Sequence, residues 1–127
     1  MSNKNLSENS WRQVKYRKRF LNALRGMYVL FKTTRHAYVY LAVTLTVILL
    51  GFYLKISPLE WVALTFAIGL VFVVEAINTA IEIDIDLTSP TFHPYARDTK
   101  DVAAAAVLLS VFVAIITGLI VFLPKIL

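Results

Sequence analysis

Three polar side chains interrupt an apolar segment in the middle of this 127-residue chain. No charged residue occurs between Trp61 and Val74, and Glu75, Asn78 and Glu82 then follow at intervals of three and four residues. This spacing places all three side chains on one stripe of an α-helix. Because a carboxylate near the hydrocarbon of a membrane costs at least a few kcal/mol, the stripe indicates a binding or catalytic site and not a device for stability.

The types of these side chains suggest a division of roles. Glu75 lies about two helical turns deeper in the apolar segment than Glu82, and a carboxylate there is a candidate general base for a hydroxyl group that comes from the membrane. Glu82 is a candidate ligand for Mg²⁺, which prefers hard oxygen ligands and bridging phosphates. Asn78 can hydrogen-bond a phosphate or another ligand oxygen between them. The alternative is that each group only locks helix packing, but three on one stripe favour a site.

The composition indicates that lipid is the solvent for much of the chain. Hydrophobic residues make up 58% of it, which is more apolar surface than a soluble domain of this size can bury. A soluble enzyme and a disordered chain are therefore poor interpretations. The chain has no cysteine, which excludes disulfide bonds and thiolate metal sites. No cleavable signal segment is expected, because many charges precede the first long apolar run.

Positive charge is concentrated before residue 36. Nine of the thirteen lysine and arginine residues lie there, accompanied by a single acid, Glu8. For a membrane protein, this asymmetry predicts a cytoplasmic N-terminus. Nucleic-acid binding is the other interpretation of such a basic run. Anionic lipid headgroups explain it better beside a membrane segment, so we expect no nucleic-acid partner.

Four helical segments are expected after a polar, disordered tail at 1–9. The segment 10–34 mixes basic residues with tryptophan, phenylalanine and leucine, a pattern typical of an amphipathic helix that lies in the membrane surface. Three membrane helices are expected to follow, at 37–54, 59–86 and 102–124. An odd number of crossings places the C-terminus outside.

The connections between the expected membrane helices are polar. The run Lys55-Ile-Ser57-Pro58 ends the first helix, and Pro58 suits the first turn of the next one. The segment 87–94 contains two prolines and is expected to be a loop on the cytoplasmic side. Asp101 is then either a residue that opens the third helix or a member of the site. The polar end of the second helix faces the cytoplasm in this topology, where nucleotide and bilayer lipid are both in reach.

A single chain provides few walls around the polar stripe. Three helices cannot shield two glutamates and an asparagine from lipid, so neighbouring copies are expected to complete the enclosure. The alanine run from Ala103 to Ala106, with Ser110 one turn later, supports close approach of helices. We therefore expect an all-α integral membrane protein that forms one domain over 1–127 and associates with copies of itself.

The same residues resemble the signature of a known family, the small prokaryotic diacylglycerol kinases and their relatives, the undecaprenol kinases. The matching residues lie in the run Glu75-Ala-Ile-Asn78-Thr-Ala-Ile-Glu82, followed by Asp86, His93 and Lys100-Asp101. The similarity covers about residues 15–124. The loop from Ser89 to Pro94 looks more like the undecaprenol-kinase branch.

The resemblance implies a homotrimer of the bacterial inner membrane, with a surface helix and three membrane helices in each chain and with active sites shared between neighbouring subunits. It implies phosphorylation of the hydroxyl group of undecaprenol or diacylglycerol, with ATP as substrate and Mg²⁺ as cofactor. By position, it implies Glu75 as the catalytic base and Glu82 as a metal ligand. The residues assigned to the nucleotide and the lipid are Lys15, Asn78, Asp86, Lys100 and Asp101.

One position departs from the family pattern. The family carries a second metal-binding glutamate on the surface helix, eight residues after a glycine that aligns with Gly26, and this chain has Thr34 there. A threonine hydroxyl is a neutral and weaker ligand for a hard dication than a carboxylate. Two alternatives to a lipid kinase therefore stay open: a lipid-phosphate phosphatase, and a non-catalytic protein that binds lipid or the membrane.

Overall fold

The computed structural model describes residues 16–127, and every regular element within them is an α-helix. The helices are α2 (Tyr16–Thr33), α3 (Arg35–Leu54), α4 (Pro58–Thr88) and α5 (Pro94–Ile126). This architecture confirms the predicted all-α fold class. The expected tail, the first residues of the expected surface helix and Lys15 lie outside the described residues.

Three of these helices, α3, α4 and α5, are long and apolar enough to cross a membrane. The 20 residues of α3 span roughly 30 Å at 1.5 Å per residue, which is the thickness of the hydrocarbon core. Large apolar side chains are widely exposed on these helices, and Phe66 and Leu108 are 77% and 71% exposed. Such exposure fits helices whose surroundings are lipid or other copies of the chain.

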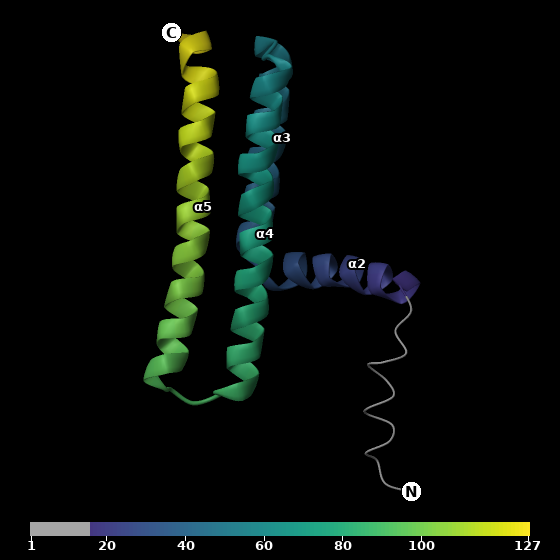
Figure 1. Ribbon diagram of the computed structural model, residues 1–127, viewed down its shortest axis with the longest axis vertical. Helices are drawn as coiled ribbons and strands as arrows, with labels where there is room; N and C mark the ends of the chain where they lie inside the picture. Colours follow the sequence, from purple (N-terminus) through teal and green to yellow (C-terminus); the bar gives the residue numbers. More distant parts are fainter. Residues whose placement is uncertain (1–15) are drawn as a thin grey trace, which may run out of the picture.

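The helices form an antiparallel bundle with one perpendicular arm. Figure 1 shows α4 and α5 side by side, α3 behind α4, and α2 roughly perpendicular to all three. Contacts between α4 and α5 are the most extensive in the described part of the chain. The arm α2 joins the bundle part-way along its length, so the α4–α5 hairpin projects well past the level of α2.

The connection between α3 and α4 is a short capped turn. Lys55 ends α3 in the left-handed region, with φ of 52°, and its N–H bonds back to the carbonyl of Gly51. Ser57 and Glu60 form a capping box at the start of α4, and Pro58 takes the first turn as predicted. Both helices begin and end within two residues of the bounds expected from the sequence.

The buried core lies at the end of the bundle next to this turn. It consists of Ile56, Leu64, Val121 and Phe122, with Val47, Leu50, Leu54 and Trp61 packed against it. Gly51 permits the close approach of α3 to α4, because a Cβ atom there would lie only 2.6 Å from Cη2 of Trp61. The same end is joined by an ion pair of 3.4 Å between Lys125 and Glu60. The helix that carries the polar stripe is therefore packed firmly at the end next to the α3–α4 turn.

The helix α5 begins earlier than the apolar span of 102–124 indicated. The imidazole Nδ1 of His93 accepts a hydrogen bond of 3.2 Å from the backbone N–H of Tyr95, and Pro94 takes the first helical position. The chain therefore turns back directly after a short loop. Asp101 lies about two turns inside α5, so its interpretation as a helix-start residue is wrong. Hydropathy marks where lipid begins, not where the helix begins.

Candidate functional site

The predicted catalytic stripe lines one hollow of about 710 Å³, where the junction of α2 and α3 meets α4 and α5. The stripe contributes Glu75, Asn78 and Glu82 from α4, and the junction contributes Thr34. The other lining residues are Thr33, Arg35, His36, Tyr40, Ala104, Val107, Leu108 and Val111. Four positions that the sequence assigned to one site are thus brought together within a single chain.

Glu75 is the most deeply buried carboxylate in the described part of the chain, with 3% of its surface exposed. The phenol group of Tyr40, from α3, lies beside this carboxylate in the same hollow. A buried carboxylate that faces an open hollow can take a proton from a hydroxyl group placed there. Sequence analysis missed Tyr40, because one aromatic residue in an apolar run carries no signal of its own.

Asn78 and Glu82 are linked one helical turn apart. The amide Nδ2 of Asn78 donates a hydrogen bond of 3.2 Å to Oε1 of Glu82. Asn78 is 7% exposed, and its Oδ1 has no hydrogen-bond partner among residues 16–127. Glu82 is half-buried, so its carboxylate is open to the hollow. The stripe therefore ends in a carboxylate with an unpaired amide oxygen next to it.

Thr34 lies at the position where the resemblance expects a second metal ligand. Its hydroxyl group is 3.0 Å from the hydroxyl of Thr79, which follows Asn78 on α4 and is 4% exposed. Thr34 is also the residue that precedes the first turn of α3. The altered position is therefore part of the hollow and is held in place by α4.

The oxygen atoms that line this hollow are of the kind that Mg²⁺ prefers as ligands. No group of three or more histidine, aspartate and glutamate side chains converges within residues 16–127. Mg²⁺ usually takes only one or two carboxylates, and it completes its shell with substrate phosphates and water. The carboxylate of Glu82 and the unpaired oxygen of Asn78 are hard oxygen donors, so the residues present fit this ion.

Three further predicted residues lie in a separate hollow of about 280 Å³ at the tip of the α4–α5 hairpin. There the ammonium group of Lys100 pairs with the carboxylate of Asp86. On an exposed face of α5, Nε of Arg97 lies 3.7 Å from Oδ2 of Asp101, which follows four residues later in the sequence. Within one chain, these groups form their own cluster outside the hollow of Glu75. His93, at the same tip, serves as the cap of α5.

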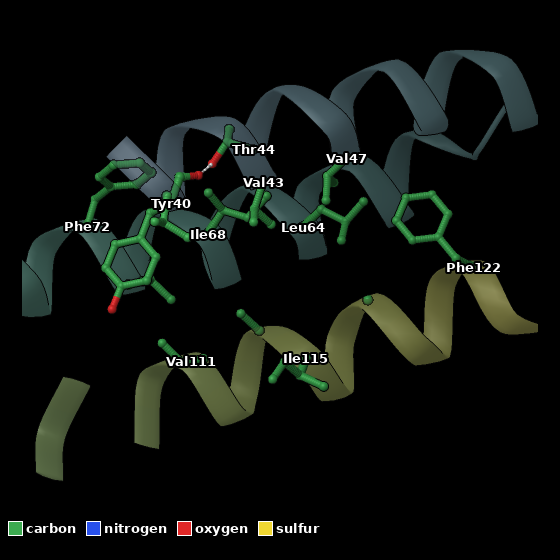
Figure 2. A pocket seen from close by; sticks show the side chains of 14 residues that line it. Tyr40, Val43, Thr44, Val47, Leu64, Ile68, Phe72, Val111, Ile115 and Phe122 are labelled. Carbon is green, nitrogen blue, oxygen red and sulfur yellow. Dashed lines mark hydrogen bonds between the residues drawn. The ribbon is translucent and has the colours of Figure 1, made fainter. Parts of the chain in front are cut away.

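An apolar groove of about 390 Å³ adjoins the polar hollow and runs between α3, α4 and α5. Tyr40 and Val111 line both spaces, so the groove starts beside Glu75. Figure 2 shows side chains of all three helices pointing into the groove, from Tyr40 at one end to Phe122 near the other. Its lining consists of aliphatic and phenylalanine side chains, apart from Tyr40, Thr44 and Gly118.

A family model described as prokaryotic diacylglycerol kinase matches residues 21–122. This chain belongs to that family. The undecaprenol kinase of Bacillus subtilis is 38% identical over 108 residues, which cover 85% of this chain and 88% of that protein. The diacylglycerol kinase of Synechocystis is 33% identical over 85% of this chain and 62% of its own length. That of Escherichia coli is 35% identical over 58% of this chain and 60% of its own.

Membership of the diacylglycerol kinase family confirms the resemblance and the predicted class of enzyme, a lipid kinase. The matched range includes the whole of the polar hollow and the hairpin tip, whose lining residues run from Thr33 to Val111. The roles of the individual side chains stay predictions, and Lys15 lies outside the described residues.

Proposed function

We propose that this protein transfers the γ-phosphoryl group of ATP, with Mg²⁺ as cofactor, to the hydroxyl group of a membrane lipid. The observation that supports this function most strongly is the position of Glu75. Its buried carboxylate stands where a polar hollow meets an apolar groove, so a lipid with a hydroxyl head group can lie in both. A soluble alcohol has no need of the groove.

In the proposed reaction, Glu75 accepts the proton of the lipid hydroxyl as its oxygen attacks the γ-phosphorus of ATP. The new bond joins the lipid oxygen to this phosphorus, the bond between the phosphorus and the oxygen bridging to the β-phosphate breaks, and ADP leaves. Catalysis of this kind rests on positioning and on neutralisation of charge. The apolar walls of the groove exclude water, which is the competing acceptor.

Glu82 is the residue proposed to hold Mg²⁺, at the end of the stripe that is nearer to water. The ion, when bound, neutralises charge on the phosphates of ATP. Lys100 is proposed to contact a phosphate; its ammonium group has three donors, so its bond to Asp86 leaves two available. Asn78, Asp86 and Asp101 are proposed to complete the surroundings of the nucleotide and the lipid head.

The separation of the two hollows supports a shared site. Lys100 and Asp101 lie at the hairpin tip and outside the hollow of Glu75 in the same chain. We propose a homotrimer in which the hairpin of one subunit faces the hollow of its neighbour, in a bacterial inner membrane with the N-terminus cytoplasmic and the C-terminus outside. The wide exposure of apolar side chains leaves ample surface for such association.

Undecaprenol is the first candidate for the acceptor, and diacylglycerol is the second. The match with an undecaprenol kinase runs over most of both chains, whereas the diacylglycerol kinases are matched over smaller shares of their own lengths. The apolar groove between three helices also suits an isoprenoid chain.

An assay on the purified protein in detergent micelles tests this function. Undecaprenol, diacylglycerol and ceramide are offered separately with ATP and Mg²⁺, and ADP, phosphorylated lipid and inorganic phosphate are measured in parallel. We expect ADP and phosphorylated lipid in equal amounts, most with undecaprenol. Phosphate released from a lipid phosphate without ATP would instead indicate a phosphatase. A folded oligomer that turns over none of these lipids would indicate a non-catalytic member.

A further inference from the structure

Tyr40 is the residue of α3 that lies where the polar hollow meets the apolar groove, because it lines both spaces. It is half-buried, and its phenol group lies close enough to the carboxylate of Glu75 to act as a hydrogen-bond donor. Figure 2 shows Tyr40 at the end of the groove opposite Phe122, with its hydroxyl oxygen pointing away from Phe122. The ring therefore belongs to the apolar wall, and the hydroxyl group belongs to the polar hollow.

The ring of Tyr40 is held by the helix that carries the candidate base. It packs edge-on against the ring of Phe72, with the two centroids 6.2 Å apart and the planes at 83°. Phe72 precedes Glu75 by three residues on α4, so the two side chains lie on the same face of that helix. The contact with Phe72 thus keeps the phenol next to the face of α4 on which Glu75 lies.

The carboxylate of Glu75 needs hydrogen-bond donors. The residue is 3% exposed, and a carboxylate that is buried without a donor is costly. A carboxylate only accepts hydrogen bonds, so the phenol is the donor of this pair. A carboxylate also accepts several bonds at once, so other donors can reach Glu75 without displacing the phenol. A bond from Tyr40 is therefore compatible with a site that neighbouring subunits complete.

We propose that Tyr40 is a positioning residue for the base: its hydroxyl group donates a hydrogen bond to one carboxylate oxygen of Glu75 and leaves the other oxygen to face the hydroxyl group of the lipid. This role rests on the proposed kinase function. The terminal torsion of a glutamate side chain is broad, so a carboxylate without such a bond can take many orientations. A bond to one oxygen restricts the rotation and holds the other oxygen within reach of the proton that it accepts. Tyr40 keeps its own proton throughout.

The kinetics of Tyr40→Phe in mixed micelles test this role. Phenylalanine keeps the ring and its contact with Phe72, and it removes only the hydroxyl group. We expect kcat to fall about 10- to 100-fold, while KM for the lipid and for Mg-ATP stays within about twofold of the wild-type value. Tyr53→Phe is the matched control, because Tyr53 is on the same helix, is 82% exposed and lines neither the hollow nor the groove. Its kinetic constants should be those of the wild type.

A double-mutant cycle shows whether Tyr40 acts through Glu75. In a Glu75→Gln background the base is already absent, so Tyr40→Phe should change the residual rate by less than about twofold. A further tenfold loss in that background would overturn the proposal, because the hydroxyl group would then act on the reaction by another route. A wild-type kcat in Tyr40→Phe alone would overturn it too.

Thermal unfolding detects the bond without any assay of activity. In the wild-type background, Tyr40→Phe leaves the buried carboxylate with one donor fewer, so the melting temperature should fall by a few degrees. In a Glu75→Leu background the phenol has no carboxylate to bond, so the same change should have little effect or raise the melting temperature. Equal decreases in both backgrounds would mean that the hydroxyl group does not bond to Glu75, and the proposal would fail.

The positioning role and the kinase function can fail separately. If lipid is phosphorylated and Tyr40→Phe is as active and as stable as the wild type, the positioning role fails and the kinase function stands. If the melting temperatures show the bond while no lipid is phosphorylated, the contact between Tyr40 and Glu75 stands, but the kinase function fails and the positioning role fails with it.

Discussion

The hydroxyl groups of Thr34 and Thr79 lie 3.0 Å apart and join the start of α3 to the middle of the polar stripe. This bond fixes the level at which α2 leaves the bundle (Figure 1). If α2 lies in the membrane surface, Glu75 is one turn below that level, towards the hydrocarbon. Glu82 is nearly one turn above it, towards water. In the proposed reaction, the stripe thus offers a base to the lipid and a metal ligand to the nucleotide.

The first prediction concerns the buried base. Glu75→Gln keeps the size of the side chain and one of its acceptor oxygens but cannot accept the proton, so we expect lipid phosphorylation to fall by a factor of about 10²–10⁴. The binding of Mg-ATP should stay close to that of the wild type. Both are measured on the purified oligomer in mixed micelles.

The matched control for this variant is Glu60→Gln. Glu60 is on the same helix, at the far end from Glu75, and glutamine can preserve the capping box with Ser57. The variant loses only a partly exposed ion pair with Lys125, so activity should stay within about twofold of the wild type. Unchanged phosphorylation in Glu75→Gln would remove the general-base role.

The second prediction concerns the altered position at Thr34. Thr34→Glu restores a carboxylate beside Asn78 and Glu82, so the Mg²⁺ concentration for half-maximal activity should fall by about tenfold, which corresponds to ~1.4 kcal/mol. Titration of the kinase assay with Mg²⁺ measures it. Leu59→Glu adds the same charge at an exposed position at the other end of α4, away from both hollows, and should leave the titration unchanged. If the two variants gave identical titrations, the hypothesis that Thr34 weakens the binding of Mg²⁺ would be contradicted.

The polar stripe could be predicted from the sequence because helical periodicity fixes which side chains share a face. No tertiary information was needed to place Glu75, Asn78 and Glu82 together. The start of α4 could also be located from local sequence, because proline favours the first turn of a helix and Pro58 takes that position. The neighbour of Glu75, Tyr40, comes from another helix, and single-sequence patterns carry no information on such pairs. The start of α5 was misplaced because polar residues after Pro94 continue the helix beyond the lipid. The histidine and proline at 93 and 94 were the signal that could have located it.

The third prediction concerns the shared site. Glu75→Gln and Lys100→Met subunits should each form inactive oligomers. When equal amounts are exchanged randomly, about a quarter of the sites pair an intact hollow with an intact neighbouring hairpin, so about a quarter of wild-type activity should return. Activity is measured before and after subunit exchange in detergent. If each site used Glu75 and Lys100 of one chain, no activity would return.

The fourth prediction concerns the close approach of α3 and α4 next to the turn that joins them. A methyl group at Gly51 would meet the ring of Trp61 at 2.6–2.8 Å, so Gly51→Ala should destabilise the protein by about 1–3 kcal/mol. Gly69→Ala is the control, because a Cβ atom there meets nothing within 4 Å and alanine favours the helix by up to about 1 kcal/mol. Thermal unfolding in micelles compares the two. A Gly51→Ala variant as stable as Gly69→Ala would mean that α3 and α4 are farther apart than described.

The last prediction concerns the apolar groove. A Cβ atom at Gly118 meets nothing within 4 Å, and this residue lines the groove, so Gly118→Leu can fill the space without a backbone clash. We expect KM for the lipid to rise about tenfold while KM for ATP is unchanged, because the hydrocarbon chain loses its place and the polar hollow does not change. Gly69→Leu, outside this groove, should leave both values unchanged.

The size of the oligomer separates this role of the groove from another. If a helix of a second copy fills the groove, Gly118→Leu should shift the oligomer towards monomers in size-exclusion chromatography with light scattering. A variant that keeps its size and loses affinity for lipid alone places the hydrocarbon chain there. This result would connect the choice of acceptor to the three helices that surround Tyr40 and Val111, where the groove opens beside Glu75.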